Sequence, residues 1–317
     1  MVVRLTSGSE NKMHPNYIKA RKSNLFLYQT VPLYYTANGE RYGIYKPSGM
    51  NLKEMRVREN LIPRELYLKK TDKAKGMRDV QKAFNKQLQD DIKSNNLENV
   101  KSTVVKLVDE MFSEPSSGVL EGLSSTVSII VGEYTKDAEV IKNFWRISDK
   151  DYTTALHSVN VMALAIRYAI SRKYNKTKTK LLGLCALLHD IGKTKTNADI
   201  LTAPRKLSDE DFAKIKSHPI QGYNLLKRCR FPNPEVKLTA LQHHEKLDGS
   251  GYPSGLTQIS KFAQIISILD CFEALTNDDR PYRDSMIPYK ALDLIQKDVI
   301  DGKLDKDIYA KFIYSLL

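Results

Sequence analysis

The feature that most constrains this chain is a histidine–aspartate pair, His189 and Asp190, at the end of the apolar run 181–188. An ionised carboxylate that is buried without a partner is very costly, so the pair is not ordinary core filling. Five of the six histidines fall between residues 157 and 244, inside or beside apolar segments. Because a bound cation stabilises carboxylate and imidazole ligands together, the pattern favours a metal site.

The other candidate ligands also lie on or directly after apolar helical faces. His243 and His244 extend a stripe that contains Val236 and Ala240, at the spacing of one helix face. Each histidine alone is as well explained as a hydrogen-bonded core residue, but a core with this many imidazoles and carboxylates is not. We therefore expect one cluster, formed by His157, His189, Asp190, His218, His243, His244 and Asp270.

Five imidazoles and two carboxylates are too many ligands for one tetrahedral zinc ion. They suit two divalent ions about 4 Å apart that share a carboxylate, an arrangement used to hydrolyse phosphoesters. Nitrogen and oxygen ligands without cysteine favour iron, manganese or zinc over calcium and magnesium. The ligand set itself does not choose among these three metals.

The local patterns predict a mainly α fold, a helical bundle preceded by a small α+β module. Residues 1–24 are polar and expected to be loosely ordered, whereas short β-like runs follow at 25–28, 31–35, 42–45 and 61–68, with a hairpin at Asn38-Gly39. From Gly76 onward the spacing is helical, including a helix predicted at 138–147. The expected domains are a module at 1–76 and a helical region at 77–317, with lead-in helices at 77–146 and a catalytic core at 147–317.

Composition bounds the partners and the compartment. The net charge of +13 fits a nucleotide or nucleic acid, although a solvated basic face is the simplest interpretation. Three cysteines without Cys-x-x-Cys spacing indicate a reduced, cytoplasmic setting. No apolar stretch approaches the length of a membrane span. We expect neither a membrane nor nucleic acid as a partner.

The candidate ligands stand in short motifs whose combination is specific. These are His157, His189-Asp190-x-Gly192-Lys193, His218-Pro219, His243-His244-Glu245, Asp248-Gly249-x-Gly251-Tyr252-Pro253, Asp270-x-Phe272-x-Ala274-Leu275-Thr276 and Arg280-Pro281-Tyr282-Arg283. In this order they resemble the bacterial HD-GYP family, a branch of the HD-domain metal-dependent phosphohydrolases. The resemblance covers about residues 147–290.

The resemblance implies a helical bundle that hydrolyses cyclic di-GMP to pGpG or GMP through a dimetal-bound hydroxide. It implies one metal on His157, His189, Asp190 and Asp270, and a second on Asp190, His218, His243 and His244. Asp190 would bridge the two ions, of which iron is the first expectation and manganese or zinc the alternatives. Lys193 would act beside Asp190 in catalysis. Substrate would contact Gly251, Tyr252, Pro253, Arg280 and Arg283.

This chain also departs from the family pattern. Thr153 stands where members with three metals carry a glutamate, so two metals are expected here. Glu273 replaces a common aspartate, and the segment 194–205 differs from the usual loop. These changes leave two alternatives open: a catalytically weak or inactive cyclic-dinucleotide receptor, or a hydrolase of cyclic GMP-AMP. A protein partner bound through the N-terminal module is a further expectation.

Overall fold

The chain forms two compact units, residues 1–83 and 84–317. The structure, a computed structural model, describes residues 14–50, 52–53, 55, 62–113, 115, 119–134, 144, 153–201, 205, 208–277 and 286–317. The boundary between the units falls inside helix α1 (Lys73–Lys93), whose first turns belong to the first unit.

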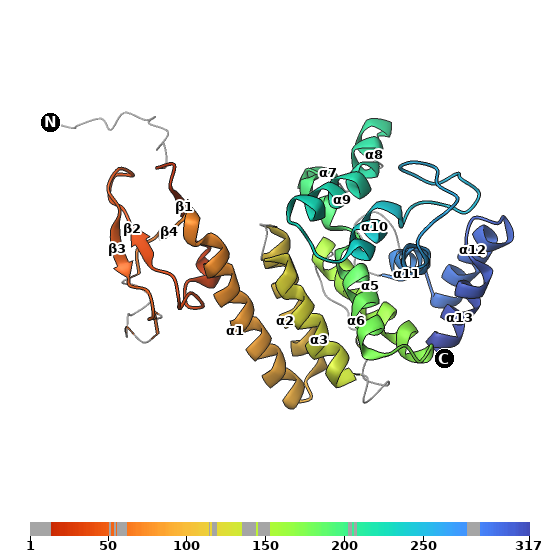
Figure 1. The fold of residues 1–317 in the computed structure, drawn as a ribbon, viewed down its shortest axis with the longest axis horizontal. Helices are drawn as coiled ribbons and strands as arrows, with labels where there is room; N and C mark the ends of the chain where they lie inside the picture. The colour runs from red at the N-terminus through yellow and green to blue at the C-terminus, as the bar shows by residue number, and fades with distance from the viewer. Residues whose placement is uncertain are drawn as a thin grey trace. The chain divides into compact units, whose positions relative to one another are not determined.

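The first unit contains a four-stranded antiparallel sheet with the order β1-β4-β2-β3 (Figure 1). The strands are β1 (Tyr17–Lys19), β2 (Leu33–Tyr35), β3 (Gly43–Lys46) and β4 (Tyr67–Lys69). Strands β2 and β3 form the hairpin predicted around Asn38-Gly39, and Gly39 takes the left-handed conformation with φ 78°. Strand β1 lies in the segment that was expected to be loosely ordered.

The prediction of a strand at 25–28 is wrong. The short 3₁₀ helix η1 (Lys22–Asn24) precedes it, and the amide of Leu27 donates to the carbonyl oxygen of Asn24 at 2.9 Å, which makes a turn. Leu25 and Tyr28 are both buried from this turn. Their spacing suits a helical turn as well as a strand, so the local pattern alone could not separate the two.

The buried Asp79 fixes the start of α1 against the segment before β2. Its carboxylate accepts hydrogen bonds from the amides of Gln29 at 3.0 Å and Thr30 at 2.7 Å, and from the Thr30 hydroxyl. A second 3₁₀ helix, η3 (Lys70–Asp72), connects β4 to α1. The buried carboxylate thus satisfies backbone donors that the turn leaves unpaired.

The described residues of the second unit form helices and loops without a strand, so the mainly α prediction is confirmed. Its elements are α2 (Leu97–Ser113), η4 (Leu120–Gly122), α3 (Leu123–Tyr134), α5 (Thr154–Ser171), α6 (Lys176–Leu188), η5 (Ile191–Lys195), α7 (Ala198–Leu201), α8 (Asp209–Lys216), α9 (His218–Arg228), α10 (Pro234–Gln242), α11 (Lys261–Thr276), α12 (Pro288–Ile300) and α13 (Lys306–Leu316). Most of the helix predicted at 138–147 lies outside the described residues. Within the described part of the chain, no helix combines the length and the apolar character needed to cross a membrane.

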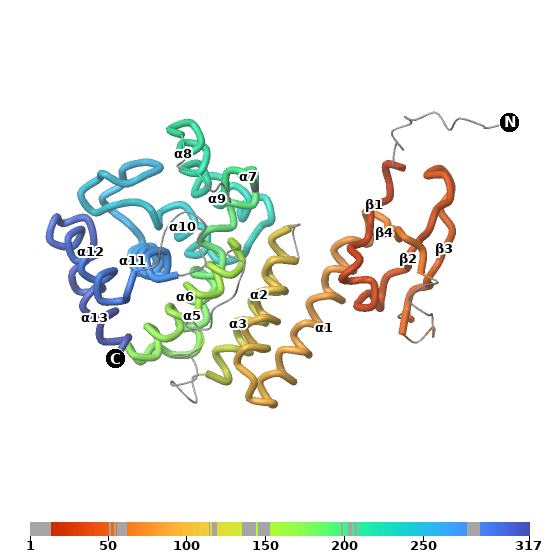
Figure 2. Tube along the Cα trace, turned by 180° about the vertical axis from the view of Figure 1, so that it is seen from behind, coloured from red at the N-terminus to blue at the C-terminus, as the bar shows by residue number. Residues whose placement is uncertain are grey.

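Helix α5 forms the centre of the second unit. Every residue from Ala155 to Ala169 is buried, as expected for a helix surrounded by others. It contacts α2, α6, α11 and α13, and both views show it beside α6 (Figures 1 and 2). Helix α6 ends at Leu188 and α9 begins at His218. These two helix ends and others meet beside the first turn of α5.

Gly192 allows two segments of the second unit to pack closely. Helix α6 ends four residues earlier, at Leu188, and Gly192 lies within η5. A methyl group on Gly192 would collide with the carbonyl oxygen of His218 and the amide nitrogen of Gly222, both in α9. The absence of a side chain therefore lets η5 lie directly against α9 and sets the distance between Asp190 and His218.

We predict that Gly192→Ala lowers the free energy of unfolding by about 1–3 kcal/mol or more, because the new methyl group overlaps backbone atoms that cannot rotate away. Chemical denaturation measures this change. Gly132→Ala in α3 is the matched control, since a methyl group there meets nothing within 4 Å. The control should be neutral or stabilise the helix by up to about 1 kcal/mol. A Gly192→Ala protein as stable as the parent would contradict the packing argument.

Candidate metal centre

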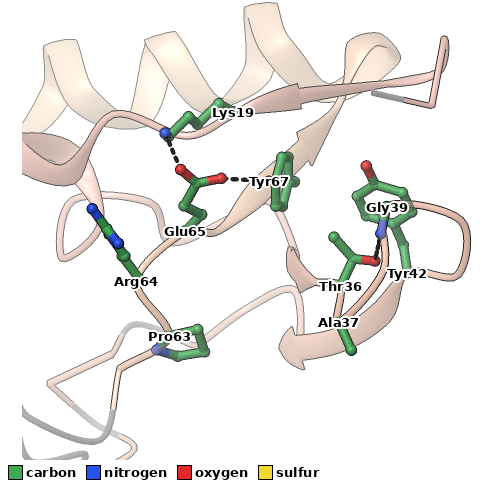
Figure 3. A pocket seen from close by; sticks show the side chains of 9 residues that line it. All are labelled: Lys19, Thr36, Ala37, Gly39, Tyr42, Pro63, Arg64, Glu65 and Tyr67. Atoms are coloured by element: carbon green, nitrogen blue, oxygen red, sulfur yellow. Dashed lines mark hydrogen bonds and ion pairs between the residues drawn. The ribbon is translucent and has the colours of Figure 1, made fainter. Parts of the chain in front are cut away.

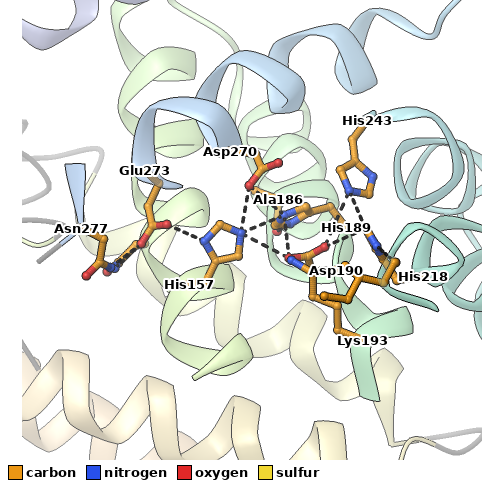
Figure 4. Close-up of polar contacts among 12 residues, drawn as sticks. His157, Ala186, His189, Asp190, Lys193, His218, His243, Asp270, Glu273 and Asn277 are labelled. Atoms are coloured by element: carbon orange, nitrogen blue, oxygen red, sulfur yellow. Dashed lines mark hydrogen bonds and ion pairs between the residues drawn. The ribbon is translucent and has the colours of Figure 1, made fainter. Parts of the chain in front are cut away.

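The structure brings all seven predicted metal ligands together (Figure 4 labels six of them). Their donor atoms form three overlapping groups in which all atoms lie within 4.8 Å of one another: Asp190, His218, His243 and His244; His157, His189 and Asp190; and His189, His243 and Asp270. The residues come from α5, the end of α6, the start of α9, the end of α10, and α11. Segments more than a hundred residues apart in the sequence therefore meet at one point.

Asp190 lies between two pairs of imidazoles. Its Oδ2 atom is 3.3 Å from His157 Nε2 and 3.5 Å from His189 Nε2. Its Oδ1 atom is 3.1 Å from His218 Nε2 and 3.6 Å from His243 Nε2. Each carboxylate oxygen thus faces its own pair of ring nitrogens, which is the geometry of a carboxylate shared between two cations.

The histidines turn their Nε2 atoms toward the cluster because their Nδ1 atoms are already engaged. Three rings donate from Nδ1 to a backbone carbonyl oxygen within the preceding turn: His189 to Ala186 at 2.6 Å, His218 to Ile215 at 2.7 Å, and His243 to Thr239 and Ala240 at 3.1 Å. A carbonyl oxygen only accepts, so Nδ1 carries the proton and the neutral ring keeps a lone pair on Nε2.

These lone pairs face one another across short distances. The Nε2 atoms of His218 and His243 lie 3.2 Å apart. The Nε2 atom of His189 also lies 3.3 Å from Nε2 of His157, a ring that the surrounding carboxylates favour in its protonated form. The Oδ1 atom of Asp190 is buried and accepts no hydrogen bond from the described residues. Facing lone pairs and an unsatisfied carboxylate oxygen are costly unless a cation lies among them, so the donor set fits divalent metal ions.

His157 is held by a second layer of polar side chains. Its Nδ1 atom lies 2.5 Å from Glu273 Oε2, and the other carboxylate oxygen of Glu273 accepts from Asn160 at 2.9 Å and Asn277 at 2.6 Å. A carboxylate behind a ligating histidine fixes the orientation of the ring and raises its basicity. The sequence places Glu273 on the same helix face as Asp270 and marks it as a substitution, but it does not indicate this role behind His157.

The electrostatic environment keeps the donors in their metal-binding forms. Burial lowers the pKa of His243 to about 4. Burial, together with the neighbouring His243, holds the pKa of His244 well below its usual range. Both rings are therefore neutral at neutral pH, as metal ligation requires.

The acidic residues of the centre remain ionised. Burial raises the pKa of Asp190, but Lys193 and His189 outweigh it and hold that pKa well below its usual range. The ammonium of Lys193 forms an ion pair with Asp190 Oδ2.

For His157 the balance is reversed: burial lowers its pKa, but the surrounding carboxylates, Glu273 first, raise it well above the usual value. The centre therefore attracts positive charge, whether as a proton or as a metal ion.

Tyr252 forms one wall beside the cluster. Its ring stacks on His244, with centroids 4.6 Å apart and planes 20° apart. The ammonium of Lys216 lies 5.3 Å from the centroid of the same ring, a contact that the sequence did not reveal. Burial raises the pKa of Tyr252, so its hydroxyl stays protonated and can donate a hydrogen bond.

The loop that carries Tyr252 is held by Glu245, which the sequence analysis quoted within a motif without giving it a role. The Glu245 carboxylate is buried and accepts from the amides of Ser254 at 2.8 Å and Leu256 at 3.0 Å. A methyl group on Gly251 would collide with the amide nitrogen of Lys246. Gly251 thus allows the loop to fold onto its own backbone, a tighter approach than the contact with a ligand that was expected.

The structure describes some of the remaining predicted site residues and not others. Pro253 follows Tyr252 in the same loop and is half-buried. Arg280 and Arg283 lie outside the described residues. Thr153 caps α5, since its hydroxyl oxygen accepts from the amide of Leu156 at 3.1 Å. The position that carries a glutamate in the three-metal pattern is thus used here to begin a helix.

Comparisons with known proteins agree with this architecture. A sequence model described as the HD domain matches residues 141–308. The chain is 33% identical over 195 residues to the cyclic di-GMP phosphodiesterase PA4108 of Pseudomonas aeruginosa, covering 61% of this chain and 46% of that protein. It is 36% identical over 165 residues to the 3'3'-cGAMP-specific phosphodiesterase 1 of Vibrio cholerae, covering 51% of this chain and 38% of that protein. The chain thus spans less than half the length of these two relatives.

A solved structure shows the same fold. Bd1817, an HDG"Y"P protein from Bdellovibrio bacteriovorus, has a TM-score of 0.62 at 21% identity, and the match covers 94% of this chain and 98% of that one. At this identity the likeness concerns the fold alone. The HD-domain match, by contrast, spans more than half of the chain and contains all seven converging donors. The chain therefore belongs to the HD-domain family, and the predicted resemblance to its HD-GYP branch is confirmed.

Proposed function

We propose that this protein is a metal-dependent phosphodiesterase that hydrolyses cyclic di-GMP to pGpG or GMP. The observation that carries the proposal is the position of Asp190, whose two oxygens each face a separate pair of histidine Nε2 atoms. Such a donor set suits two adjacent divalent ions, which are used for the displacement reactions of phosphodiesters. The name of the Pseudomonas aeruginosa relative supports cyclic di-GMP as the substrate.

Two ions would divide the donors between them. The first would be held by His157, His189, Asp190 and Asp270, and the second by Asp190, His218, His243 and His244. Nitrogen and oxygen donors without thiolates suit iron, with manganese or zinc as alternatives. When bound, such ions lower the pKa of water from about 16 to about 7 and polarise a phosphoryl oxygen.

The chain's own residues would then orient the substrate and balance its charge. Lys193 pairs with Asp190 at the edge of the cluster, so its ammonium is placed to stabilise negative charge on the phosphate. Tyr252 offers an aromatic face for a base and a protonated hydroxyl for a phosphate oxygen. Gly251 and Pro253 shape the loop that carries it. Contacts from Arg280 and Arg283 to the phosphates remain predictions from the sequence.

The location and the partners belong to the same proposal. A cytoplasmic setting agrees with the three free thiols of Cys185, Cys229 and Cys271. The proposed ligand is a cyclic dinucleotide, and a protein partner of the N-terminal unit remains an expectation from the sequence.

Cyclic GMP-AMP is the second candidate substrate. Two relatives from Vibrio cholerae, 36% and 34% identical, carry the name 3'3'-cGAMP-specific phosphodiesterase. The ratio of kcat/KM values for the two cyclic dinucleotides, measured with the same metal-loaded protein, decides between them. Tight binding without turnover of either would instead indicate a receptor.

We predict that His244→Ala lowers phosphodiesterase activity by more than about 100-fold and reduces the metal content from two ions per chain toward one, because one ion loses a ligand. Product chromatography and elemental analysis measure the two effects on protein loaded with iron or manganese under reducing conditions. Tyr314→Ala is the control, since Tyr314 is an exposed residue of α13 that belongs to neither the cluster nor its surroundings. Full activity in His244→Ala would contradict the proposed site.

We predict that Glu273→Gln lowers metal affinity or activity by about 10–100-fold, because Glu273 orients His157 without binding the metal itself. Glu273→Asp should retain more activity than Glu273→Gln, since it keeps a carboxylate behind the ring. Metal titrations of both variants separate this positioning role from a general loss of stability. Equal affinities for Glu273→Gln and the parent would show that the carboxylate has no influence on the centre.

A further inference from the structure

The sheet of the first unit exposes an unusual combination of side chains. In the antiparallel register Tyr17 lies opposite Lys69, and both Lys19 and Tyr34 lie opposite Tyr67, so these five side chains share one face, on which Tyr34 alone is buried. We call this the tyrosine face. On the other side of the same strands, Leu68 is buried in the core. The exposed side of a half-buried sheet usually carries small polar residues, whereas this one carries aromatic rings and cations.

Two hollows adjoin the tyrosine face, and Tyr42 lines both of them. The first has a volume of about 470 Å³ and is lined by Tyr67 and Arg64 among others (Figure 3). The second has a volume of about 570 Å³, with Tyr17 and Lys70 in its lining. Both volumes lie in the range of pockets that hold small ligands. The shared ring of Tyr42 places one hollow next to the other.

The aromatic rings form an ordered platform. Tyr42 stacks on Tyr17 with centroids 3.9 Å apart and planes 5° apart, and it meets Tyr67 edge-on at 5.2 Å. His14 packs edge-on against Tyr17 and Tyr42. Rings that are fixed in this way present stacking surfaces at little entropic cost, and every nucleobase has a flat face that can use them.

Exposed cations accompany the rings. Arg64 and Lys70 are exposed, and neither side chain forms a hydrogen bond or an ion pair with another described residue. The carboxylate of Glu65, which also lines the first hollow, is already engaged by Lys19 and by the Tyr67 hydroxyl at 2.7 Å (Figure 3). Glu40 lines the second hollow.

The charge of the whole chain is concentrated in this unit. Residues 1–83 contain 17 Lys and Arg against 7 Asp and Glu, a net charge of +10 out of the chain's +13. The remaining residues carry only +3 between them. A basic unit with exposed cations beside aromatic rings favours a ligand that bears both phosphates and bases.

We propose that the tyrosine face is a second, non-catalytic binding site for phosphodiester-linked nucleotides. One base occupies each hollow on either side of Tyr42, and Arg64 and Lys70 contact the phosphates. All of the residues involved belong to the first unit, so the site does not depend on the proposed catalytic function. Two kinds of ligand combine phosphates and bases in this way. One is a cyclic dinucleotide, for which the site would be regulatory. The other is a single-stranded nucleic acid, which was not expected as a partner from the sequence.

Fluorescence anisotropy with the full chain tests the proposal, using labelled cyclic di-GMP in one arm and a labelled single-stranded RNA hexamer in the other. Arg64→Gln should weaken binding and, in the RNA arm, reduce the slope of log affinity against log salt by about one. Tyr42→Ala should weaken binding by about 5–100-fold, the worth of one stacked base. Arg78→Gln, the control, removes the same charge from an exposed position of α1 outside both hollows, and should change affinity much less.

The possible outcomes distinguish the two kinds of ligand from each other and from a failure of the proposal. Cyclic di-GMP binding that survives His244→Ala but is weakened by Arg64→Gln supports a regulatory site, and RNA binding weakened by the same variant supports a nucleic-acid site. Absence of binding by the His244→Ala protein in both arms overturns the proposal. Equal losses of affinity in Arg64→Gln and Arg78→Gln also overturn the proposal, since they indicate unspecific attraction to positive charge. Binding of an acidic peptide in place of either nucleotide overturns it as well. Turnover measured on the same preparations tests the catalytic proposal separately. Because the Arg64 side chain is exposed, Arg64→Gln should leave the folding of the sheet intact.

Discussion

The shared carboxylate of Asp190 is the constraint on which the second unit depends. A buried aspartate between four imidazoles requires that α5, α6, α9 and α10 all end or begin at the same place. Helix propensity does not impose such a convergence. It follows from a fully buried central helix, α5, and from Gly192, which removes the side chain that would keep η5 away from α9. The packing of these helices thus buries a polar centre, although the burial of its unpaired charges is in itself unfavourable.

Polar contacts around this centre fix its donors before any ion binds. Backbone carbonyl groups hold three of the imidazoles through Nδ1, and Glu273 holds the fourth, His157. Glu245 performs a comparable task for the loop of Tyr252, because it satisfies two backbone amides from within the core. The centre and the wall beside it are therefore positioned by separate carboxylates, neither of which needs to touch a metal or a substrate.

The residues of the centre were predictable from the sequence because their chemistry is unusual at buried positions. Histidine and aspartate on apolar helical faces are rare enough that their grouping indicated a metal site, and the helical spacing gave the correct fold class. The roles of Glu245 and Gly192 were not predictable, since each depends on a contact between segments that local spacing does not relate. The turn at 25–28 was mistaken for a strand because its apolar residues fit either structure. Strand β1 was missed because it lies within the mostly polar segment before Leu25.

The proposed centre holds two transition ions, one on either side of Asp190. Anomalous scattering at the absorption edge of the bound metal, recorded on crystals of the iron- or manganese-loaded protein, tests it most directly. We expect two anomalous peaks about 4 Å apart, one beside His157 and His189 and the other beside His218 and His243. A single peak, or peaks away from Asp190 in fully loaded protein, would contradict it.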